Sequence, residues 1–555
     1  MERAGDGEST GARAAPTRSP FSYPVFRAIW TANLLSNLGY LIQSVGASWL
    51  MTQLAPSPAM VALVQASVSL PVLLLALVAG AIADSLDRRR VMLVAQCFML
   101  AVSLSLSLLA GLHLVTPLLL LGFTFLIGCG MALNGPASQA AVGDMVPKAA
   151  LPAAIGYNSV SFNVARSAGP AIGGAIVAAA GAAAAFAANC FSYVWLILVL
   201  LRWRPQPDAR ELPPERIGSA VASGIRYAAM SPHLLKVMLR AVMFAGASSA
   251  ISALMPVVAR DLLHGGAITY GVLLGGFGVG AIGGALLSAP LRKRMPAQSV
   301  VGLAATAVAI GAVGTAEGAH IAVVLPALTL AGGGWILAMS TLNATMQLAS
   351  PRWVVGRSIA LYQTAAFGGL ALGAWLFGMA ATAYGIRTAL LAAAALQLLG
   401  VLAGHYIRLP HVDDLNLDPL RRWSEPAIEL PVEARSGPVS ITLSYRIDPA
   451  DTAEFLAVMR EHRRVRLRDG ARRWSLSRDL ANPPLWVERY QVPTWLEYVR
   501  HNQRRTHADA VNLDRIHRLH RGDGPPEIRR LIEVQPGVDH VADADPVPRP
   551  FTDHP

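Results

Sequence analysis

Two stretches of the chain match each other at an offset of 204 residues. Gly80-Ala-Ile-Ala-Asp84-Ser-Leu-Asp-Arg88-Arg89-Arg90 is echoed by Gly284-Ala-Leu-Leu-Ser-Ala-Pro-Leu-Arg292-Lys293-Arg294. The leading glycine and the three cations fall at the same places in both. Pro147-Lys148 and Pro351-Arg352 are separated by the same offset of 204 residues. Tyr157-Asn158 and Tyr362-Gln363 are separated by 205 residues. Several features at one offset predict that the chain is built from two related halves.

The two stretches interrupt a strongly apolar sequence. The chain has 555 residues, of which 14% are charged, whereas soluble domains carry about 25%. Apolar stretches of roughly 20 residues recur, the length that crosses ~30 Å of hydrocarbon. We therefore predict an all-α membrane protein with twelve transmembrane helices in two six-helix pseudo-repeats. The predicted spans are 27–51, 60–83, 90–111, 115–135, 152–178, 183–202, 236–260, 270–290, 297–315, 320–346, 357–382 and 386–407.

Lysine and arginine positions set the expected orientation. The loops that hold Arg88–Arg90 and Arg292–Arg294 are rich in basic residues, whereas the opposite loops hold only Arg260 and Arg387. Because cytoplasmic loops carry the positive excess, both termini are predicted to be cytoplasmic. The net charge of +12 follows from the same rule, so no nucleic-acid partner is expected. The three cysteines lie inside predicted spans, which indicates no disulfide framework.

The same pattern divides the chain into segments. We predict a disordered cytoplasmic arm over 1–26 and a cytoplasmic linker between the two bundles. A second linker, a soluble α+β domain and a disordered tail follow the second bundle. The boundaries are 1–26, 27–202 for the first bundle, 203–235 for its linker, 236–408 for the second bundle, 409–437 for the second linker, 438–535 and 536–555.

The loop between the second and third spans is the most specific local signal. Its candidate residues are Gly80, Asp84, Arg88, Arg89 and Arg90. A carboxylate four residues before a cation can face the same neighbouring helix end. There the carboxylate can accept hydrogen bonds from free N–H groups, and the cations can pair with carboxylates or carbonyl ends. Such a latch would close the cytoplasmic side in one state. The alternative is a basic anchor without a gating role.

This loop resembles the motif between helices 2 and 3 of the major facilitator superfamily, although Asp87 stands where that family usually has glycine. With Asn33-Leu-Leu-Ser-Asn37-Leu-Gly39, it is similar to the enterobactin-exporter-like branch, also called transmembrane secretion effectors. The resemblance implies a secondary transporter of the bacterial plasma (inner) membrane.

The fifth span carries Ala165-Arg166-Ser-Ala-Gly169-Pro170-Ala-Ile-Gly173-Gly174. Small residues four apart let another helix approach closely, and a proline permits a bend. The stretch resembles the glycine–proline motif of superfamily exporters, with Ala165 in place of its first glycine. That resemblance implies efflux. Ordinary small-residue packing is the alternative.

Arg166 is predicted to lie roughly 21 Å into the membrane, at 1.5 Å per residue from Pro152. A charge on the lipid face there costs at least ~2.5–3.5 kcal/mol, so Arg166 should face the bundle interior. We expect it to bind an anionic substrate or couple the two states, or else to pair with Asn163 or Asn134. Amides and aromatic residues of other spans suggest a polar substrate path, comprising Asn33, Asn37, Gln43, Asn134, Asn163, Arg166, Trp335, Asn343, Tyr362 and Gln363.

No Asp or Glu lies deep in a predicted span; Asp84, Asp144, Asp261 and Glu317 all fall near the ends. A proton antiporter usually needs a titratable group in the membrane. Proton coupling is therefore implied by the resemblance alone.

After residue 438 the long apolar stretches end, and apolar and polar residues follow the shorter periods of strands and helices. Val439 to Tyr445 has the period of a strand, Asp451 to Arg468 that of a basic helix, and two strands and two helices follow. This order suggests a ferredoxin-like unit, which resembles small barrels of the antibiotic-biosynthesis-monooxygenase type. Its histidines show no metal-ligand spacing, and no metal, cofactor or catalytic residue is expected. Regulation or self-association is the favoured role.

The sequence thus predicts a proton-coupled exporter of siderophore-like or amphipathic small molecules that works by alternating access in the lipid bilayer. Uptake is the runner-up, and a membrane sensor or scaffold that acts through the tail is the alternative from another class.

Overall fold

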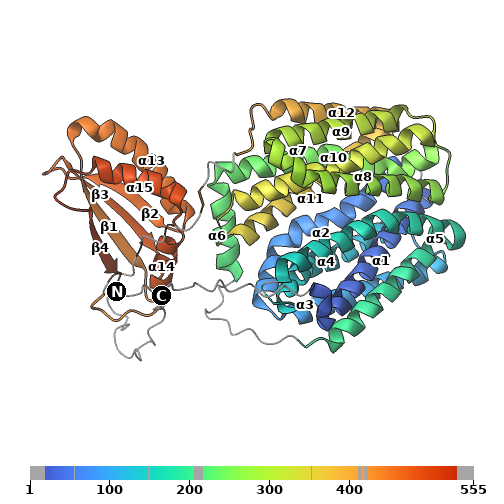
Figure 1. The fold of residues 1–555 in the computed structure, drawn as a ribbon, viewed down its shortest axis with the longest axis horizontal. Coiled ribbons are helices and arrows are strands. Elements are labelled where there is room, and N and C mark those ends of the chain that lie inside the picture. The colour runs from blue at the N-terminus through green and yellow to red at the C-terminus, as the bar shows by residue number, and fades with distance from the viewer. Residues whose placement is uncertain are drawn as a thin grey trace, which may run out of the picture. The chain divides into compact units, whose positions relative to one another are not determined.

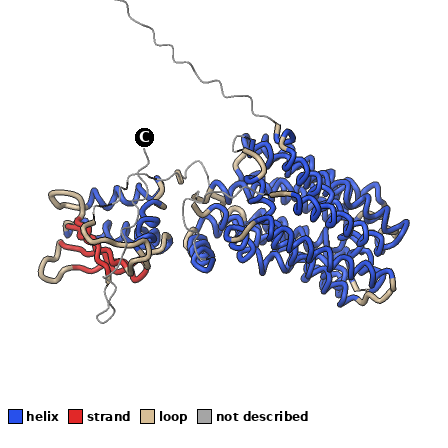
Figure 2. Tube along the Cα trace, turned by 90° about the horizontal axis from the view of Figure 1, so that it is seen from below, coloured by secondary structure: helices blue, strands red, loops and turns tan. Residues whose placement is uncertain are grey.

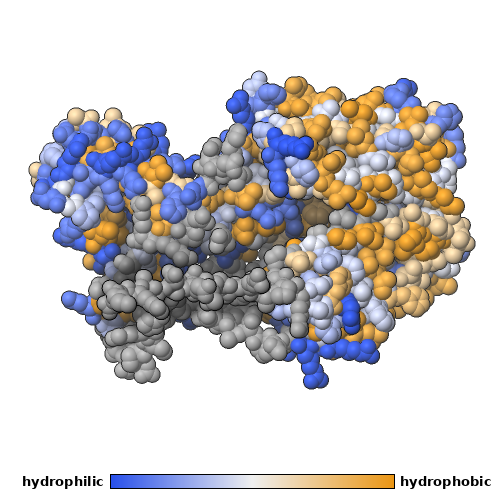
Figure 3. Space-filling model, in the orientation of Figure 1, coloured by the Kyte–Doolittle hydropathy of each residue, from blue (hydrophilic) through white to orange (hydrophobic). Residues whose placement is uncertain are grey.

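The computed structural model describes residues 19–55, 57–147, 150–204, 217–351, 353–410 and 428–533, together with Asn416, Leu417, Leu420, Trp423 and Pro426. The chain forms two compact units. The first comprises Met1–Ile217, Leu239–Leu342 and Gln363–Ile407, and the second Gly218–Met238, Asn343–Tyr362 and Arg408–Pro555. Apolar residues are spread over the visible side of the helical part (Figure 3).

The first half of the helical part consists of α1 to α5, drawn in blue to teal in Figure 1. Three of these helices begin at a proline, which is tolerated in the first turn because its missing N–H would have no partner there. Asp87 caps α3 by accepting from the backbone N–H of Arg90. The bounds are α1 Pro24–Leu54, α2 Pro58–Ser85, α3 Arg88–Gly111, α4 Pro117–Ala141 and α5 Leu151–Arg202.

Helix α5 is broken at Gly181, whose φ of 78° and ψ of 175° are not helical. The second half repeats this break with two separate helices on either side of Gly385, which has φ 87° and ψ 158°. Glycine adopts positive φ without the clash that a Cβ would cause. Since Gly181 and Gly385 are themselves 204 residues apart, the structure keeps the offset found in the sequence.

The second half consists of α7 to α12, drawn in green to yellow in Figure 1. Its helices match α1 to α5 in order when the offset is applied. The bounds are α7 Pro232–Val257, followed by a π-helical turn Val258–Leu262, then α8 Ala267–Arg294, α9 Ala297–Glu317, α10 Ile321–Leu348, α11 Val355–Tyr384 and α12 Ile386–Ala403.

Ten helices of the described part are long and apolar enough to cross a membrane. They include one run of 39 residues over Val164–Arg202, in which the break at Gly181 lies. Helix α1 is 31 residues long but is not among the ten, since amides and serines lower its hydropathy. Twelve spans require α1 and both parts of α5, and that number stays a prediction.

The predicted linker 203–235 contains a helix, α6 (Ile217–Ala229), and the first turn of α7. The segment 409–437 is described only in part, and the predicted disordered ends fall mostly outside the described residues, which begin at Ser19 and end at Glu533.

The tail contains a four-stranded antiparallel sheet in the order β2-β3-β1-β4. Its elements are β1 Val439–Arg446, α13 Thr452–Arg468, β2 Arg472–Arg478, β3 Leu485–Val492, α14 Trp495–Gln503, α15 His507–Leu519 and β4 Glu527–Ile532. The sequence prediction missed β4, because its Glu-Ile-Arg-Arg-Leu-Ile sequence is charged and largely exposed at the sheet edge.

One face of the sheet packs against helices (Figure 2). Alternate residues of β1, Ile441, Leu443 and Tyr445, are buried and contribute to the core of the tail. Their partners on β3 are Tyr490, Glu488 and Trp486. A carboxylate that is 0% exposed therefore stands in the middle of an otherwise apolar and aromatic layer, where it needs partners of its own.

Candidate functional site

The basic loop of the first half fastens helices to one another. Arg88 Nη1 donates to Asp144 Oδ1 at 2.6 Å and to the carbonyl oxygen of Ala140 at 3.2 Å. Arg89 donates to the carbonyl oxygens of Leu200 and Leu201 at 2.7 and 2.9 Å. The free carbonyl groups of a helix C-terminus attract cations. These arginines thus bind the ends of α4 and α5.

Each of these contacts stays within the first half. In the second half, the counterpart Arg292 Nη1 reaches Ser340 Oγ at 3.4 Å, again within its own half. Gly80 lies in α2 with open space around it. Arg90 lies 3.8 Å from Asp87 of the same loop. Asp84 also lies in α2, but its side chain falls outside the described residues, so its part in a latch stays a prediction.

The glycines of the α5 motif lie at helix crossings. A Cβ at Gly169 would lie 2.8 Å from Leu41 Cβ, and one at Gly173 would lie 3.0 Å from Ile42 Cα. Both therefore face α1, within the first half. Pro170 is buried beside them, and the helix runs on past it to Gly181.

Gly174 faces the other half of the protein. A Cβ there would lie 2.8 Å from both the carbonyl oxygen of Ala267 and Gly271 Cα of α8. Gly271 meets Gly174 in the same way, with a Cβ 2.9 Å from Gly174 Cα. The two backbones touch where neither residue has a side chain, so this pair sets how closely α5 and α8 approach.

Further contacts join the two halves at the bundle end opposite the basic loops, here called the opposite end. Arg260 Nη1, just after α7, donates to the carbonyl oxygen of Thr52 in α1 at 2.6 Å. Thr382 of α11 lies 3.3 Å, Oγ1 to Oγ, from Ser57 and accepts from the N–H of Ala59 at 3.1 Å. The rings of Trp49 and Tyr270 stack at 6.3 Å. The opposite end is therefore held closed.

Sequence reasoning did not assign these closing residues. Arg260 gave a signal, because it is one of only two basic residues in loops that are otherwise poor in them. Gly271 and Thr382 gave none, since glycine and threonine are common in apolar helices and their partners lie on other spans.

Arg166 of α5 lies against the second half. Its guanidinium stands 5.9 Å from the centre of the Phe277 ring in α8. Asn134, one of its predicted partners, has a buried Oδ1 that bonds to no described residue, and the other, Asn163, lies in α5 with its side chain outside the description. Arg166 itself forms no ion pair with a described carboxylate. A cation at the contact between halves that lacks an acidic partner can meet an anionic group of a ligand.

The remaining candidates for the substrate path differ in their surroundings. Gln43 is 3% exposed, and its Oε1 accepts from Ser103 at 2.9 Å and from Asn189 at 2.6 Å. Gln43 therefore ties α1 to α3 and α5 inside the first half. Trp335 packs on Phe244, with centroids 5.9 Å apart. Asn343 accepts from Gln347 one turn on. Asn33, Asn37 and Gln363 are partly exposed on α1 and α11, and Tyr362 is buried on α11.

The tail holds a buried polar cluster around Glu488. Glu488 accepts from Tyr445 Oη at 2.7 Å, Trp474 Nε1 at 2.9 Å and Arg466 Nε at 3.2 Å. Burial alone would raise the pKa of Glu488, but Arg466 and His462 lower it far below its usual range. Glu488 is therefore a permanent anion that organises the interior of the tail.

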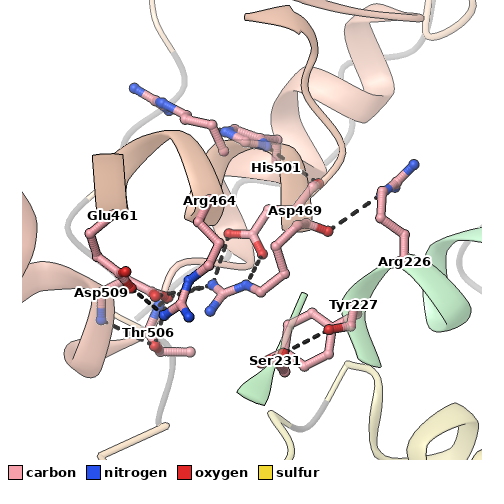
Figure 4. Close-up of polar contacts among 11 residues, drawn as sticks. Arg226, Tyr227, Ser231, Glu461, Arg464, Asp469, His501, Thr506 and Asp509 are labelled. Atoms are coloured by element: carbon pink, nitrogen blue, oxygen red, sulfur yellow. Dashed lines mark hydrogen bonds and ion pairs between the residues drawn. The ribbon is translucent and has the colours of Figure 1, made fainter. Parts of the chain in front are cut away.

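Within the second compact unit, side chains of the tail contact α6. The guanidinium of Arg468 stands 5.0 Å from the ring centre of Tyr227 and binds Asp469 and Asp509 (Figure 4). Arg226 Nε lies 3.5 Å from the carbonyl oxygen of Arg468. Arg504 stands 4.3 Å from the ring centre of Trp353, a residue between α10 and α11. Within the described residues, no group of three or more His, Cys, Asp or Glu could hold a metal ion.

Comparisons with known proteins agree with this architecture. The staphyloferrin A transporter of Staphylococcus aureus is 24% identical over 260 residues, which cover 46% of this chain and 64% of that protein. The multidrug efflux pump Tap of Mycolicibacterium fortuitum is 27% identical over 411 residues, or 70% of this chain and 96% of the pump.

Solved structures share the fold of the helical part. A bacterial homologue of the human lysosomal transporter Spinster, in an inward-facing and occupied conformation, superimposes with a TM-score of 0.58 at 15% identity, covering 74% of this chain and 100% of that one. A D-xylose–proton symporter gives 0.56 at 13% identity, over 69% and 97%. The family model described as transmembrane secretion effector matches residues 15–537, helical part and tail together, and the chain belongs to that family of major facilitator transporters.

Proposed function

We propose that this protein is a secondary active exporter that moves amphipathic, anionic small molecules of siderophore-like size by alternating access. The observation that carries the proposal is the one-sided fastening of the two halves. Arg260, Thr382 and the Gly174–Gly271 pair join them at the opposite end. At the end that holds the basic loops, the described hydrogen bonds of Arg88, Arg89 and Arg292 stay within their own halves. With the basic end in the cytoplasm, this is a state closed to the outside.

The substrate path follows from the same geometry. Arg166 lies at the contact between α5 and α8 without a described carboxylate partner, and a buried cation is stabilised when an anionic ligand supplies the missing charge. Trp335 and Phe244 add an aromatic surface in the second half. A cation beside aromatic rings suits a ligand that carries both a carboxylate and an apolar or aromatic body.

The relatives support transport of this kind and leave two directions open. One is an efflux pump and one is a siderophore transporter by name. Export is favoured by the resemblance of the Gly169–Gly174 stretch to exporter motifs. Uptake is the second candidate, since the name of the siderophore relative states no direction of transport. A sensor or scaffold role is weakened by the intact contacts between halves.

We propose proton exchange as the energy source. The spans offer no deep carboxylate in sequence, so proton coupling should depend on a group at a helix end, such as Asp84, or on the substrate itself. Collapse of the pH gradient with an ionophore should stop transport if protons drive it.

The direct test uses inside-out vesicles with a panel of siderophores and macrolides. Export predicts ATP-independent accumulation inside such vesicles, whereas uptake predicts accumulation in right-side-out vesicles. Arg166→Ala should abolish transport of anionic substrates, and Arg166→Lys should retain part of it. Arg387→Ala, at an exposed ion pair with Glu317, serves as the matched control. Unchanged anion transport in Arg166→Ala would refute the role of that residue.

Asp84→Asn tests the latch in the same vesicles. Loss of transport with normal membrane insertion is expected, while normal transport would reduce the basic loop to an orientation signal.

The tail is proposed to be a ferredoxin-like unit that regulates the transporter or pairs with a second copy. Its strand order β2-β3-β1-β4 with two helix-bearing connections is the observation behind this proposal. Mass measurement of the full chain and of a version that ends at residue 408, both in detergent, tests whether the tail brings two copies together.

A further inference from the structure

A small recess of about 20 Å³ lies inside the tail between α13, α14 and α15. Among the residues that line it are Arg466 of α13, His501 of α14, Arg505 just after α14, and Asn512 of α15. A space of about 10–15 Å³ on this measure holds one water-sized group. The recess therefore has room for a monatomic ion or for the oxygen of a small ligand.

One buried hydrogen-bond donor that lines the recess lacks an acceptor. The Nδ2 atom of Asn512 is buried and bonds to no described group. A buried donor without a partner is destabilising, so Asn512 needs an acceptor that the described chain does not supply. Beside it lies Arg505, which is partly exposed and whose charge is balanced by no ion pair with a described carboxylate.

The carboxylates nearby are already engaged. Asp469 accepts from Arg468 at 2.8 and 3.2 Å, and Asp509 accepts from the same guanidinium at 3.0 Å through both oxygens. Asp509 also accepts from the N–H and hydroxyl of Thr506, at 3.1 and 2.8 Å. Glu488 is bound by Arg466, Tyr445 and Trp474. None of the three forms an ion pair with Arg505.

The two histidines of the recess do not add positive charge. His501 Nε2 lies 3.1 Å from Arg466 Nη1, which can only donate, so His501 accepts there and is neutral. Burial, and then the charge of Arg466, lower the pKa of His501 well below its ordinary value. Burial also lowers the pKa of His462. The unbalanced charge is that of Arg505, and burial together with the neighbouring Arg466 lowers the pKa of Arg505.

We propose that this recess binds one small anion, either chloride or the carboxylate of a small organic acid, through Arg505 and Asn512. A negatively charged acceptor satisfies the orphan donor of Asn512, balances the charge of Arg505 and relieves the repulsion between Arg466 and Arg505. Asp469 and Asp509, which line the recess, are the residues that hold Arg468 over Tyr227 of α6. An anion bound there is consequently connected to α6 in the linker through Asp469 or Asp509 and then Arg468.

The test uses the purified full-length chain in detergent, exchanged into gluconate, an anion too large for the recess. Chloride is titrated and followed by the broadening of the ³⁵Cl resonance, and sodium acetate is titrated in a calorimeter. Saturable binding of at least one of the two is expected, and which one binds identifies the source of the charge. Absence of saturable binding for both overturns the proposal.

Three variants locate the site. Arg505→Gln should weaken binding at least tenfold, whereas Arg518→Gln, at an exposed position on α15, should bind like the unchanged chain. Asn512→Asp places a carboxylate of the chain itself beside the recess, so it should abolish anion binding and raise the unfolding temperature of the tail. This variant keeps the test decisive if Arg505→Gln fails to fold. Equal affinity in Asn512→Asp and the unchanged chain overturns the assignment.

Discussion

Replacement of Gly174 by alanine adds one methyl group at the place where the two halves touch. That methyl carbon would lie 2.8 Å from the carbonyl oxygen of Ala267 and from Gly271 Cα, whereas carbon atoms in favourable contact are about 3.5–4.0 Å apart. Both obstructing atoms belong to the backbone, so they cannot rotate away. Helices α5 and α8 must therefore separate by roughly 0.7 Å or more at the opposite end.

Overpacking of this kind costs about 1–3 kcal/mol. Under the proposed alternating access, the cost falls only on the state in which the opposite end is closed, because the helices separate there in the other state. The population should then shift toward the outward-open state by roughly 5- to 150-fold, the ratio that corresponds to 1–3 kcal/mol. Transport should slow, because one state of the cycle has become harder to reach.

The shift can be measured as the labelling rate of a cysteine at the closed end. Thr52 is 5% exposed, so Thr52→Cys, in a background where Cys97, Cys129 and Cys190 are serine, should react slowly with an impermeant maleimide. Gly174→Ala should raise that rate by the population factor. Gly283→Ala in α8, where a Cβ meets no atom within 4 Å, is the control. An unchanged rate in well-folded Gly174→Ala would falsify the reading of this contact as a closing element.

Three further predictions concern other contacts. Ser57→Cys with Thr382→Cys, whose hydroxyl oxygens are 3.3 Å apart, should form a disulfide on oxidation that stops transport until reductant is added; transport that survives full cross-linking contradicts alternating access at this end. Arg88→Ala and Asp144→Ala should each lower the unfolding temperature. A double-mutant cycle should give a coupling free energy of about 0.5–1 kcal/mol between the two side chains, which is larger than the coupling between Arg387 and Glu317 of the exposed ion pair. Additive effects of the two substitutions would show that the Arg88–Asp144 ion pair adds no stability. The tail should lose stability as pH falls below about 6.5, the ordinary pKa of histidine. Burial depresses the pKa of His462 and His501 in the folded tail, so the unfolded chain binds more protons at low pH. Hydrogen exchange in β3 and α14 measures the stability at each pH; His501→Gln should make it depend less on pH, and an unchanged pH dependence would contradict the role of His501.

The sequence was informative wherever a pattern repeated. The offset of 204 residues found in two loops also relates Gly181 to Gly385, two kinks that hydropathy could not show. Periodicity located three of the four tail strands to within about two residues. It missed β4 because Arg529 and Arg530 stand on an edge strand, where charged side chains reach solvent and no apolar alternation is needed.

The candidate site was less predictable, because the sequence does not distinguish an asparagine or glutamine that packs between helices from one that lines a substrate path. Gln43 was predicted to line a path, but it is bonded to Ser103 and Asn189 inside one half. Gly174 was predicted within a motif, yet its contact with Gly271 depends on a helix almost 100 residues away. Partners on other helices decide whether a small or polar residue serves packing or transport, and a single sequence does not name them.

The hydrogen bonds of a buried glutamine in each half bear on how the two halves diverged. In the first half the glutamine stands on α1 and reaches Asn189 after the break in α5. In the second half Gln397 stands on α12 and reaches Ser248 of α7 at 2.5 Å and the carbonyl oxygen of Phe244 at 3.2 Å. The same helix pair is joined each time and the donor stands on the later helix in both halves, but the glutamine has changed from the acceptor helix to the donor helix. After a duplication, each half has thus rebuilt the joint by its own route, and a chimera that exchanges α1 for α7 would bring two unmatched partners together.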